Sequence, residues 1–144
     1  MIKKMNDKYK ILFNYIKDLS VEIPNPEALI TSRNNIGKYE IKVNISSKPL
    51  KVKMVEVVTK LTYTDPKNNK HKAFFEIQYA TVIDILDPQL KKKDVEKIIL
   101  CDLQTEIYPG LEKKFLNVLH ISGFPNLEFG QKIDFVKLYN NKFS

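Results

Sequence analysis

The residues that could carry out catalytic or metal chemistry are few and lie far apart in the sequence. The chain has two histidines, His71 and His120, and one cysteine, Cys101. A metal site needs several His or Cys ligands at defined spacing, and an activated nucleophile needs a neighbouring base. Neither arrangement is present, and four scattered glycines cannot build a phosphate-binding loop. We therefore predict that the protein is not an enzyme and that it uses no cofactor and no metal.

Carboxylate pairs do occur, and most such pairs are solvated surface charge. They are Asp18 with Glu22, Asp84 with Asp87, and Asp94 with Glu96. The first pair shares the polar face of a predicted strand, about 13 Å apart at roughly 3.3 Å per residue. On a later strand Glu76 shares a face with Phe74, which places a carboxylate beside an aromatic ring. An acidic and apolar surface of this kind could dock a small basic partner, with ordinary surface as the alternative.

Alternation of polar and apolar residues predicts four strands. The first begins at Ile11, and an irregular connection follows at residues 27–37. The second strand ends in a hairpin turn at residues 46–49, and the third covers residues 50–63 with a change of phase that indicates a bulge. The fourth, at about residues 72–85, is apolar on both faces, which predicts an interior strand.

After Asp87 the apolar period becomes that of a helix. The pattern predicts a break and a new helix at Tyr108-Pro109-Gly110, a stop at Gly123, and a last short segment at residues 135–139. Strands followed by helices indicate an α+β domain, a four-stranded antiparallel sheet with two main C-terminal helices packed on one face. Because those helices cover one face only, we expect another subunit to cover the second.

Length and composition narrow the class of protein. The 144 residues suit one domain, placed at residues 11–144 after a flexible basic arm at residues 1–10. The hydrophobic content of 43%, the single cysteine and the lack of a long apolar run predict a soluble cytoplasmic protein. The net charge of +7 leaves a lysine-rich nucleic-acid-binding module as an alternative, although only Arg33 of the 24 basic residues is arginine, the residue that specific phosphate recognition favours.

Two blocks of sequence resemble the SecB family of bacterial protein-export chaperones. Residues 15–26 are similar to the family's opening strand, Tyr-x-Lys-Asp-x-Ser-x-Glu-x-Pro-Asn. Tyr108-Pro109 and Gly123-Phe124-Pro125 are similar to the family's aromatic-Pro helix start and Gly-Phe-Pro helix exit. The likeness covers about residues 13–139, and the middle strands match in pattern only.

The resemblance implies a function without catalysis. It implies a homotetramer, built as a dimer of dimers, that binds unfolded preproteins without ATP and keeps them competent for translocation. Such a chaperone delivers its clients to the SecA translocation ATPase and meets the membrane only through the translocase. A SecB-like chaperone dedicated to a single partner, such as an antitoxin, is an alternative within the same fold.

The resemblance also implies two sets of site residues. The SecA-binding residues would be Asp18, Glu22, Phe74 and Glu76. The client-binding groove would include Tyr39, Ile41, Val43, Phe115 and Leu119, each of which could equally be a core residue. Family members are commonly acidic, so the net charge of +7 is a departure from the family pattern.

Overall fold

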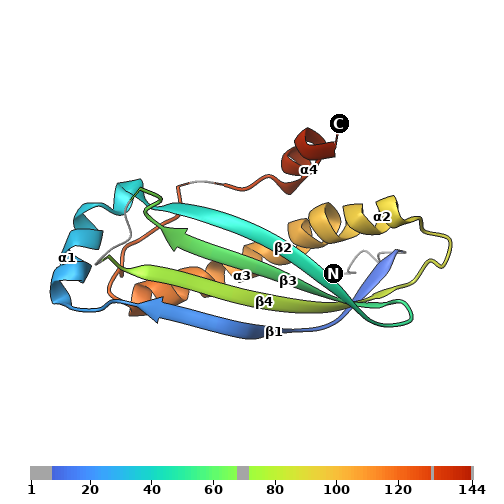
Figure 1. Ribbon diagram of the computed structural model, residues 1–144, viewed down its shortest axis with the longest axis horizontal. Coiled ribbons are helices and arrows are strands. Elements are labelled where there is room, and N and C mark those ends of the chain that lie inside the picture. The colour runs from blue at the N-terminus through green and yellow to red at the C-terminus, as the bar shows by residue number, and fades with distance from the viewer. Residues whose placement is uncertain (1–7, 68–71, 131, 144) are drawn as a thin grey trace, which may run out of the picture.

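The chain folds as a four-stranded antiparallel sheet with helices packed on one face, which confirms the predicted α+β class (Figure 1). The computed structural model describes residues 8–67, 72–130 and 132–143. The strands are β1 (Tyr9–Glu22), β2 (Glu40–Lys51), β3 (Met54–Thr64) and β4 (Phe74–Ile85). Their order in the sheet is β1-β4-β3-β2, so the first two strands of the chain form its two edges.

β4 is an interior strand, as its apolar residues predicted. Phe75, Ile77 and Ile83 have no exposed surface and pack into the core beneath the helices. Ala80 and Val82 are also buried, on the opposite face of the same strand. A strand that is buried on both faces suits the interior of a sheet, where the side chains of both neighbouring strands help to cover it. β4 accordingly pairs with β1 along one edge and with β3 along the other.

β1 begins at Tyr9, two residues before the predicted start at Ile11. The Tyr9 side chain is buried, and its hydroxyl donates a hydrogen bond to Glu106 Oε1 at 2.8 Å. Tyr9 and Lys10 therefore belong to the sheet and not to the predicted basic arm. Residues 1–7 of that arm lie outside the described residues.

The turn between β2 and β3 lies at Val52 and Lys53, so the predicted turn at residues 46–49 was wrong. Residues 46–49 continue β2 and pair with the first part of β3. The change of phase within residues 50–63, which predicted a bulge, marks the turn between β2 and β3. Pro49 is tolerated because β2 is an edge strand, where a missing amide donor interrupts no interior ladder. Pairing with β3 thus overrides the local turn preference of Ser-Ser-Lys-Pro.

Residues 27–37, predicted to be irregular, contain helix α1 (Pro26–Asn34) and a 3-10 turn, η1 (Ile36–Lys38). The Asn25 side chain caps α1 by accepting a hydrogen bond from the backbone amide of Ala28 at 2.8 Å, and Pro26 occupies the first helical position. Both are ordinary helix-start signals. The weak apolar periodicity of the segment concealed the helix.

α2 (Lys92–Lys97), a π-helical turn η2 (Ile98–Asp102) and α3 (Leu103–Ile121) follow one another without a break. The predicted break at Tyr108-Pro109-Gly110 was therefore wrong. Pro109 lies on the exposed side of α3, where water can satisfy the carbonyl that loses its amide donor. The buried stripe of α3 continues past it through Leu103, Ile107, Leu111, Phe115 and Leu119. Figure 1 shows α3 crossing one face of the sheet, and α4 (Phe135–Phe143) lying beyond β2.

One buried polar pair ties α3 to the sheet. Gln104 has no exposed surface, and its Oε1 accepts a hydrogen bond from Thr59 Oγ1 at 3.0 Å. Gln104 Nε2 donates to the carbonyl of Ile99 in η2 at 3.1 Å. A buried amide costs free energy unless it is paired, so this arrangement fixes the rotation of α3 against β3.

We expect Gln104→Met to lower the free energy of unfolding by about 2 kcal/mol, because Thr59 Oγ1 and the Ile99 carbonyl lose their partner in a dry core. Thr59→Val should lower the free energy of unfolding less in the Gln104→Met variant than in the unmodified protein, because the Thr59 hydroxyl has already lost its acceptor there. Urea unfolding at one protein concentration measures both effects. The exposed Lys113→Ala on the same helix serves as control, and strictly additive effects of the two core changes would contradict the coupling.

Candidate functional site

The four residues predicted to bind a basic partner lie together on the face of the sheet that the helices leave open. In the pairing of β1 with β4, Glu22 lies opposite Phe74, and Ser20 lies opposite Glu76. Asp18 is in the next row, opposite Gln78. Directly paired residues of antiparallel strands point to the same face, and the alternate residues of β4 are those buried under the helices.

Glu40 adds a carboxylate that the sequence reasoning did not include. It pairs with Thr64 at the start of β2, on the same open face. Three interstrand spacings separate it from Glu22, about 14 Å at roughly 4.8 Å each. The sequence signal for Glu40 was the alternation of β2, which puts it on the opposite face from the apolar Ile41. We refer to Asp18, Glu22, Glu40, Phe74 and Glu76 as the acidic patch.

The acidic patch is not uniformly negative. Glu76 Oε1 lies 3.9 Å from Lys60 Nζ, and Thr62 Oγ1 donates to the same oxygen at 3.5 Å. Asp18, Glu22 and Glu40 are exposed. The free carboxylates therefore lie at the end of the sheet where β1 ends and β2 begins.

A hydrogen-bonded carboxylate separates the acidic patch from the rest of the open face. Glu56 Oε2 accepts from Tyr15 Oη at 2.6 Å, and Glu56 Oε1 accepts from Lys17 Nζ at 3.0 Å. The hydrogen bonds from Tyr15 and Lys17 hold the pKa of Glu56 below its usual value. Glu56 is thus already neutralised within the sheet and adds little to the patch.

Exposed apolar side chains run along β1. Two register shifts, at residues 12 and 17, turn successive side chains to different faces of this edge strand. The exposed residues are Leu12, Phe13, Tyr15, Ile16, Leu19 and Val21. The cover of the open face by a second subunit stays a prediction. Of these residues, Phe13 and Tyr15 pair with Val82 and Ala80 on the open face and are apolar surface that such a subunit would bury.

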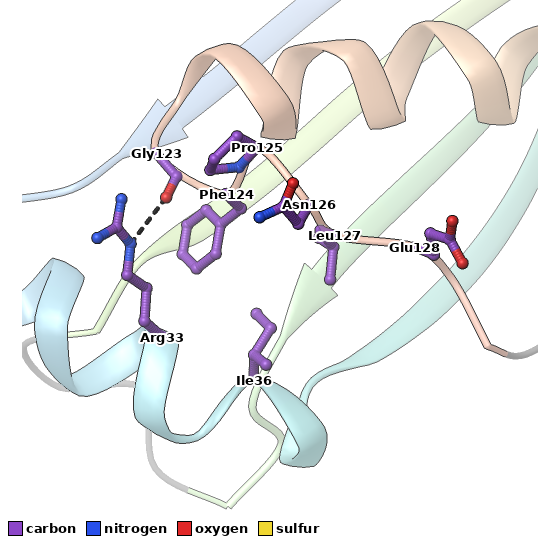
Figure 2. A pocket seen from close by; sticks show the side chains of 8 residues that line it. All are labelled: Arg33, Ile36, Gly123, Phe124, Pro125, Asn126, Leu127 and Glu128. Atoms are coloured by element: carbon purple, nitrogen blue, oxygen red, sulfur yellow. Dashed lines mark hydrogen bonds between the residues drawn. The ribbon is translucent and has the colours of Figure 1, made fainter.

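A groove follows the other edge of the sheet, along β2. Its first cavity, of about 450 Å³, lies between α1 and the segment that leaves α3 (Figure 2). Arg33 Nε donates to the Gly123 carbonyl at 2.8 Å across the end of this cavity. Gly123 has a φ of +109°, and a Cβ there would meet Leu29 Cδ1 at 2.9 Å, so this close approach of α1 requires glycine.

Two further cavities continue the groove. The second, of about 360 Å³, lies under Ile36, Tyr39, Ile41, Tyr63 and Phe129 and shares Ile36 and Leu127 with the first. The third, of about 480 Å³, is lined mainly by Val43, Ile45, Leu100, Phe135, Leu138 and Tyr139. Burial raises the pKa of Tyr63 to about 12, so its hydroxyl stays neutral in the groove. We refer to the three cavities together as the β2 groove.

The predicted client-binding residues divide between the groove and the core. Ile41 and Val43 line the groove, and so does Tyr39, although its hydroxyl donates to the Ala73 carbonyl at 2.6 Å. Phe115 and Leu119 have no exposed surface and are core residues in this chain, which is the alternative that the sequence left open for them. They lie on the stripe of α3 that packs against the sheet, and Phe115 supports the groove residue Phe129 from beneath.

Sequence reasoning missed most of the outer wall of the groove. Leu127 and Phe129 belong to the loop after α3, and Phe135 and Leu138 to α4. Phe129 packs edge-on against Tyr63, with ring centroids 5.2 Å apart. The aromatic residues of this loop were its one sequence signal, since the loop has no regular period.

The remaining reactive side chains have structural surroundings. His120 Nε2 lies 2.8 Å from the Leu127 carbonyl and anchors the loop that walls the groove. Cys101 is buried, which raises the pKa of its thiol. His71 lies outside the described residues. Within the described ranges no group of His, Cys, Asp and Glu could hold a metal ion, and no helix has the length and apolarity to span a membrane.

Comparisons with known proteins agree on one family. The family model described as preprotein translocase subunit SecB matches residues 3–144. A putative protein-export protein SecB of Pelagibacter ubique is 43% identical over 138 residues, covering 96% of this chain and 99% of the relative. A protein-export protein SecB of Parvibaculum lavamentivorans is 25% identical over 133 residues, covering 92% and 77% of the two chains.

A solved structure shows the same fold. It is a SecB-like chaperone of Mycobacterium tuberculosis in complex with a ChAD peptide from an antitoxin, with a TM-score of 0.64, 9% identity and 88% of each chain covered. At that identity the likeness concerns the fold alone. Together with the family model and the 43% identical relative, it leads to one conclusion: the chain belongs to the SecB family of protein-export chaperones.

Proposed function

We propose that this chain is an ATP-independent chaperone that holds unfolded preproteins in a translocation-competent state and delivers them to the SecA ATPase. The observation that carries the proposal is the β2 groove, an apolar channel beside an edge strand. The proposal places the protein in the cytoplasm, because a chaperone of this kind must bind its clients before they are translocated.

The groove has the chemistry that an unfolded client needs. An unfolded segment exposes apolar side chains and unpaired backbone groups. The cavities around Ile41 and Val43 can take the side chains, and β2 pairs with β3 alone among the described strands, which leaves its outer backbone edge for the client. Backbone pairing and apolar contact are insensitive to sequence, so many clients can bind. Binding that opposes folding by mass action needs no ATP.

The relatives favour general export over a dedicated partner. The mycobacterial neighbour binds a peptide from an antitoxin, which supports peptide binding by this fold. The relative at 43% identity carries the name of a protein-export protein, as does the one at 25%.

The acidic patch supports docking to SecA. The resemblance to the SecB family implies that this face takes a lysine-rich tail of SecA. Here Glu22 lies opposite Phe74, and Asp18 and Glu40 are exposed on the same face. Charge attraction raises the rate of encounter and fixes orientation more than it adds affinity.

The edge strand β1 supports a homotetramer. Its exposed apolar residues on both faces suit contact with a second copy, and four chains of 16.8 kDa would form the particle. Several grooves on one particle would convert weak contacts with one long client into tight retention.

Without ATP, a stoichiometric amount of the chaperone should halt refolding of a denatured, slow-folding precursor. The double substitution Ile41→Asn with Val43→Asn should weaken this arrest at least about tenfold, because two half-buried apolar contacts with the client are lost. The precursor's refolding rate, followed by its own fluorescence, measures both. Lys42→Asn lies between the two but on the open face, so it serves as control. Unchanged refolding with the unmodified protein would overturn the proposed function.

Charge reversal of the acidic patch should separate SecA docking from client holding. Asp18→Lys with Glu22→Lys should abolish SecA binding, because a lysine-rich partner then meets like charge. Particle mass and refolding arrest should stay unchanged, as measured by light scattering and the refolding assay. Asp94→Lys with Glu96→Lys makes the same charge change on α2 and should leave SecA binding intact. Loss of the particle's mass in the first variant would identify the acidic patch as a subunit interface.

A further inference from the structure

The end of the sheet farthest from the acidic patch carries a second exposed surface. The β2–β3 hairpin turns there at Val52 and Lys53, and Figure 1 shows this hairpin at the opposite end of the long axis from α1. Val52 is 89% exposed, and Leu50 and Leu86 are also exposed. The Lys53 carbonyl accepts from the amide of Ile85, which brings the end of β4 against the hairpin.

Lysines surround these apolar side chains. Lys51 and Lys53 flank Val52 and are exposed, and neither forms an ion pair with a carboxylate among the described residues. Lys10 lies one strand beyond, across from Asp84. The first turn of α2, with lysines at residues 91–93, lies at the same end of the molecule. We refer to Leu50, Lys51, Val52, Lys53 and Leu86 as the hairpin tip.

The residues of the turn are not those that would make the hairpin most stable. The second central residue of this two-residue turn takes a positive φ, a conformation that favours glycine or asparagine. Lys53 has a φ of 69° without being glycine, and Val52 is β-branched. The hairpin therefore keeps an exposed apolar residue and a cation at positions where folding favours neither.

We propose that the hairpin tip docks on an anionic phospholipid surface, with Val52 and Leu50 entering the headgroup region and the lysines contacting phosphate groups. Apolar insertion combined with basic charge is the chemistry of interfacial membrane binding. The hairpin tip has only five residues, whereas a stable protein interface takes about 20 to 30 residues from each partner. Nucleic acid would attract the lysines but make no use of the exposed apolar side chains, and specific recognition of nucleic acid favours arginine.

The geometry allows lipid contact and partner docking at the same time. The hairpin tip and the acidic patch lie at opposite ends of the sheet, so a membrane beneath the tip leaves the acidic patch free. This inference goes beyond the proposed chaperone function, because it requires neither client nor SecA.

Flotation of the full chain with lipid vesicles at low salt tests the proposal. Binding is expected to vesicles of phosphatidylcholine with phosphatidylglycerol and to be lost on pure phosphatidylcholine. Val52→Asn with Lys53→Gly should weaken binding about tenfold and leave the thermal midpoint unchanged or higher, because glycine suits the positive φ of residue 53 and asparagine is a common turn residue. Ile121→Ser removes an equally exposed apolar residue, 86% exposed at the far end of α3, and should have no effect.

A second pair of variants separates local from global charge. Lys51→Glu with Lys53→Glu should weaken vesicle binding at least about tenfold, because lysines at the lipid surface act individually. Lys38→Glu with Lys67→Glu makes the same change in net charge at exposed positions near α1 and should bind as the unmodified chain does. No binding to anionic vesicles, or an equal loss in both variants, would overturn the proposal. So would binding to RNA that is tighter than binding to the vesicles and insensitive to Val52→Asn with Lys53→Gly.

Discussion

The pairing of β1 with β4, and not with β2, is the constraint on which the rest of the structure depends. Because β4 is apolar on both faces, it must lie inside the sheet, and the chain must cross from one edge to the other before β2 can begin. α1 and η1 make that crossing. The buried Ser32 hydroxyl holds the crossing in place, since it accepts from the Ala73 amide at 2.8 Å and lies 3.1 Å from the Tyr39 hydroxyl.

The β2 groove follows from the same constraint. α3 covers the middle of the sheet and leaves the β2 edge to the loop after α3 and to α4 (Figure 1). A loop cannot fill that space as closely as a packed helix, so cavities remain between its aromatic anchors. Phe124 packs on Phe75 and Phe129 on Tyr63, while His120 holds the carbonyl of Leu127. The wall is fixed at these points, and the space between them is open to a ligand.

Periodicity predicted the interior strand, the shared face of Asp18 and Glu22, and the shared face of Phe74 and Glu76. It did not predict that β1 and β4 are neighbours, which is what brings the two pairs together. It failed where tertiary contact overrides local preference. Ser-Ser-Lys-Pro resembles a turn but pairs with β3, and Pro109 resembles a helix start but lies on the solvent side of a continuous helix. The outer wall of the groove could not be predicted, since Leu127 and Phe129 lie in a loop whose place is set by α3 and β2 together.

The net charge of +7 describes neither end of this molecule. β2 has 12 residues and spans about 36 Å at roughly 3.3 Å per residue. Exposed charges are screened over about 8 to 10 Å at physiological salt, so the two ends of the sheet act almost independently. Carboxylates at the start of β2 and the end of β1 can attract a basic partner, although lysines dominate the hairpin beyond Pro49. Lysines are present at the acidic end as well, where Lys60 lies beside Glu76 and Lys42 shares the open face with Glu40. The acidic docking surface therefore rests on the exposed carboxylates Asp18, Glu22 and Glu40, and not on the net charge of that end.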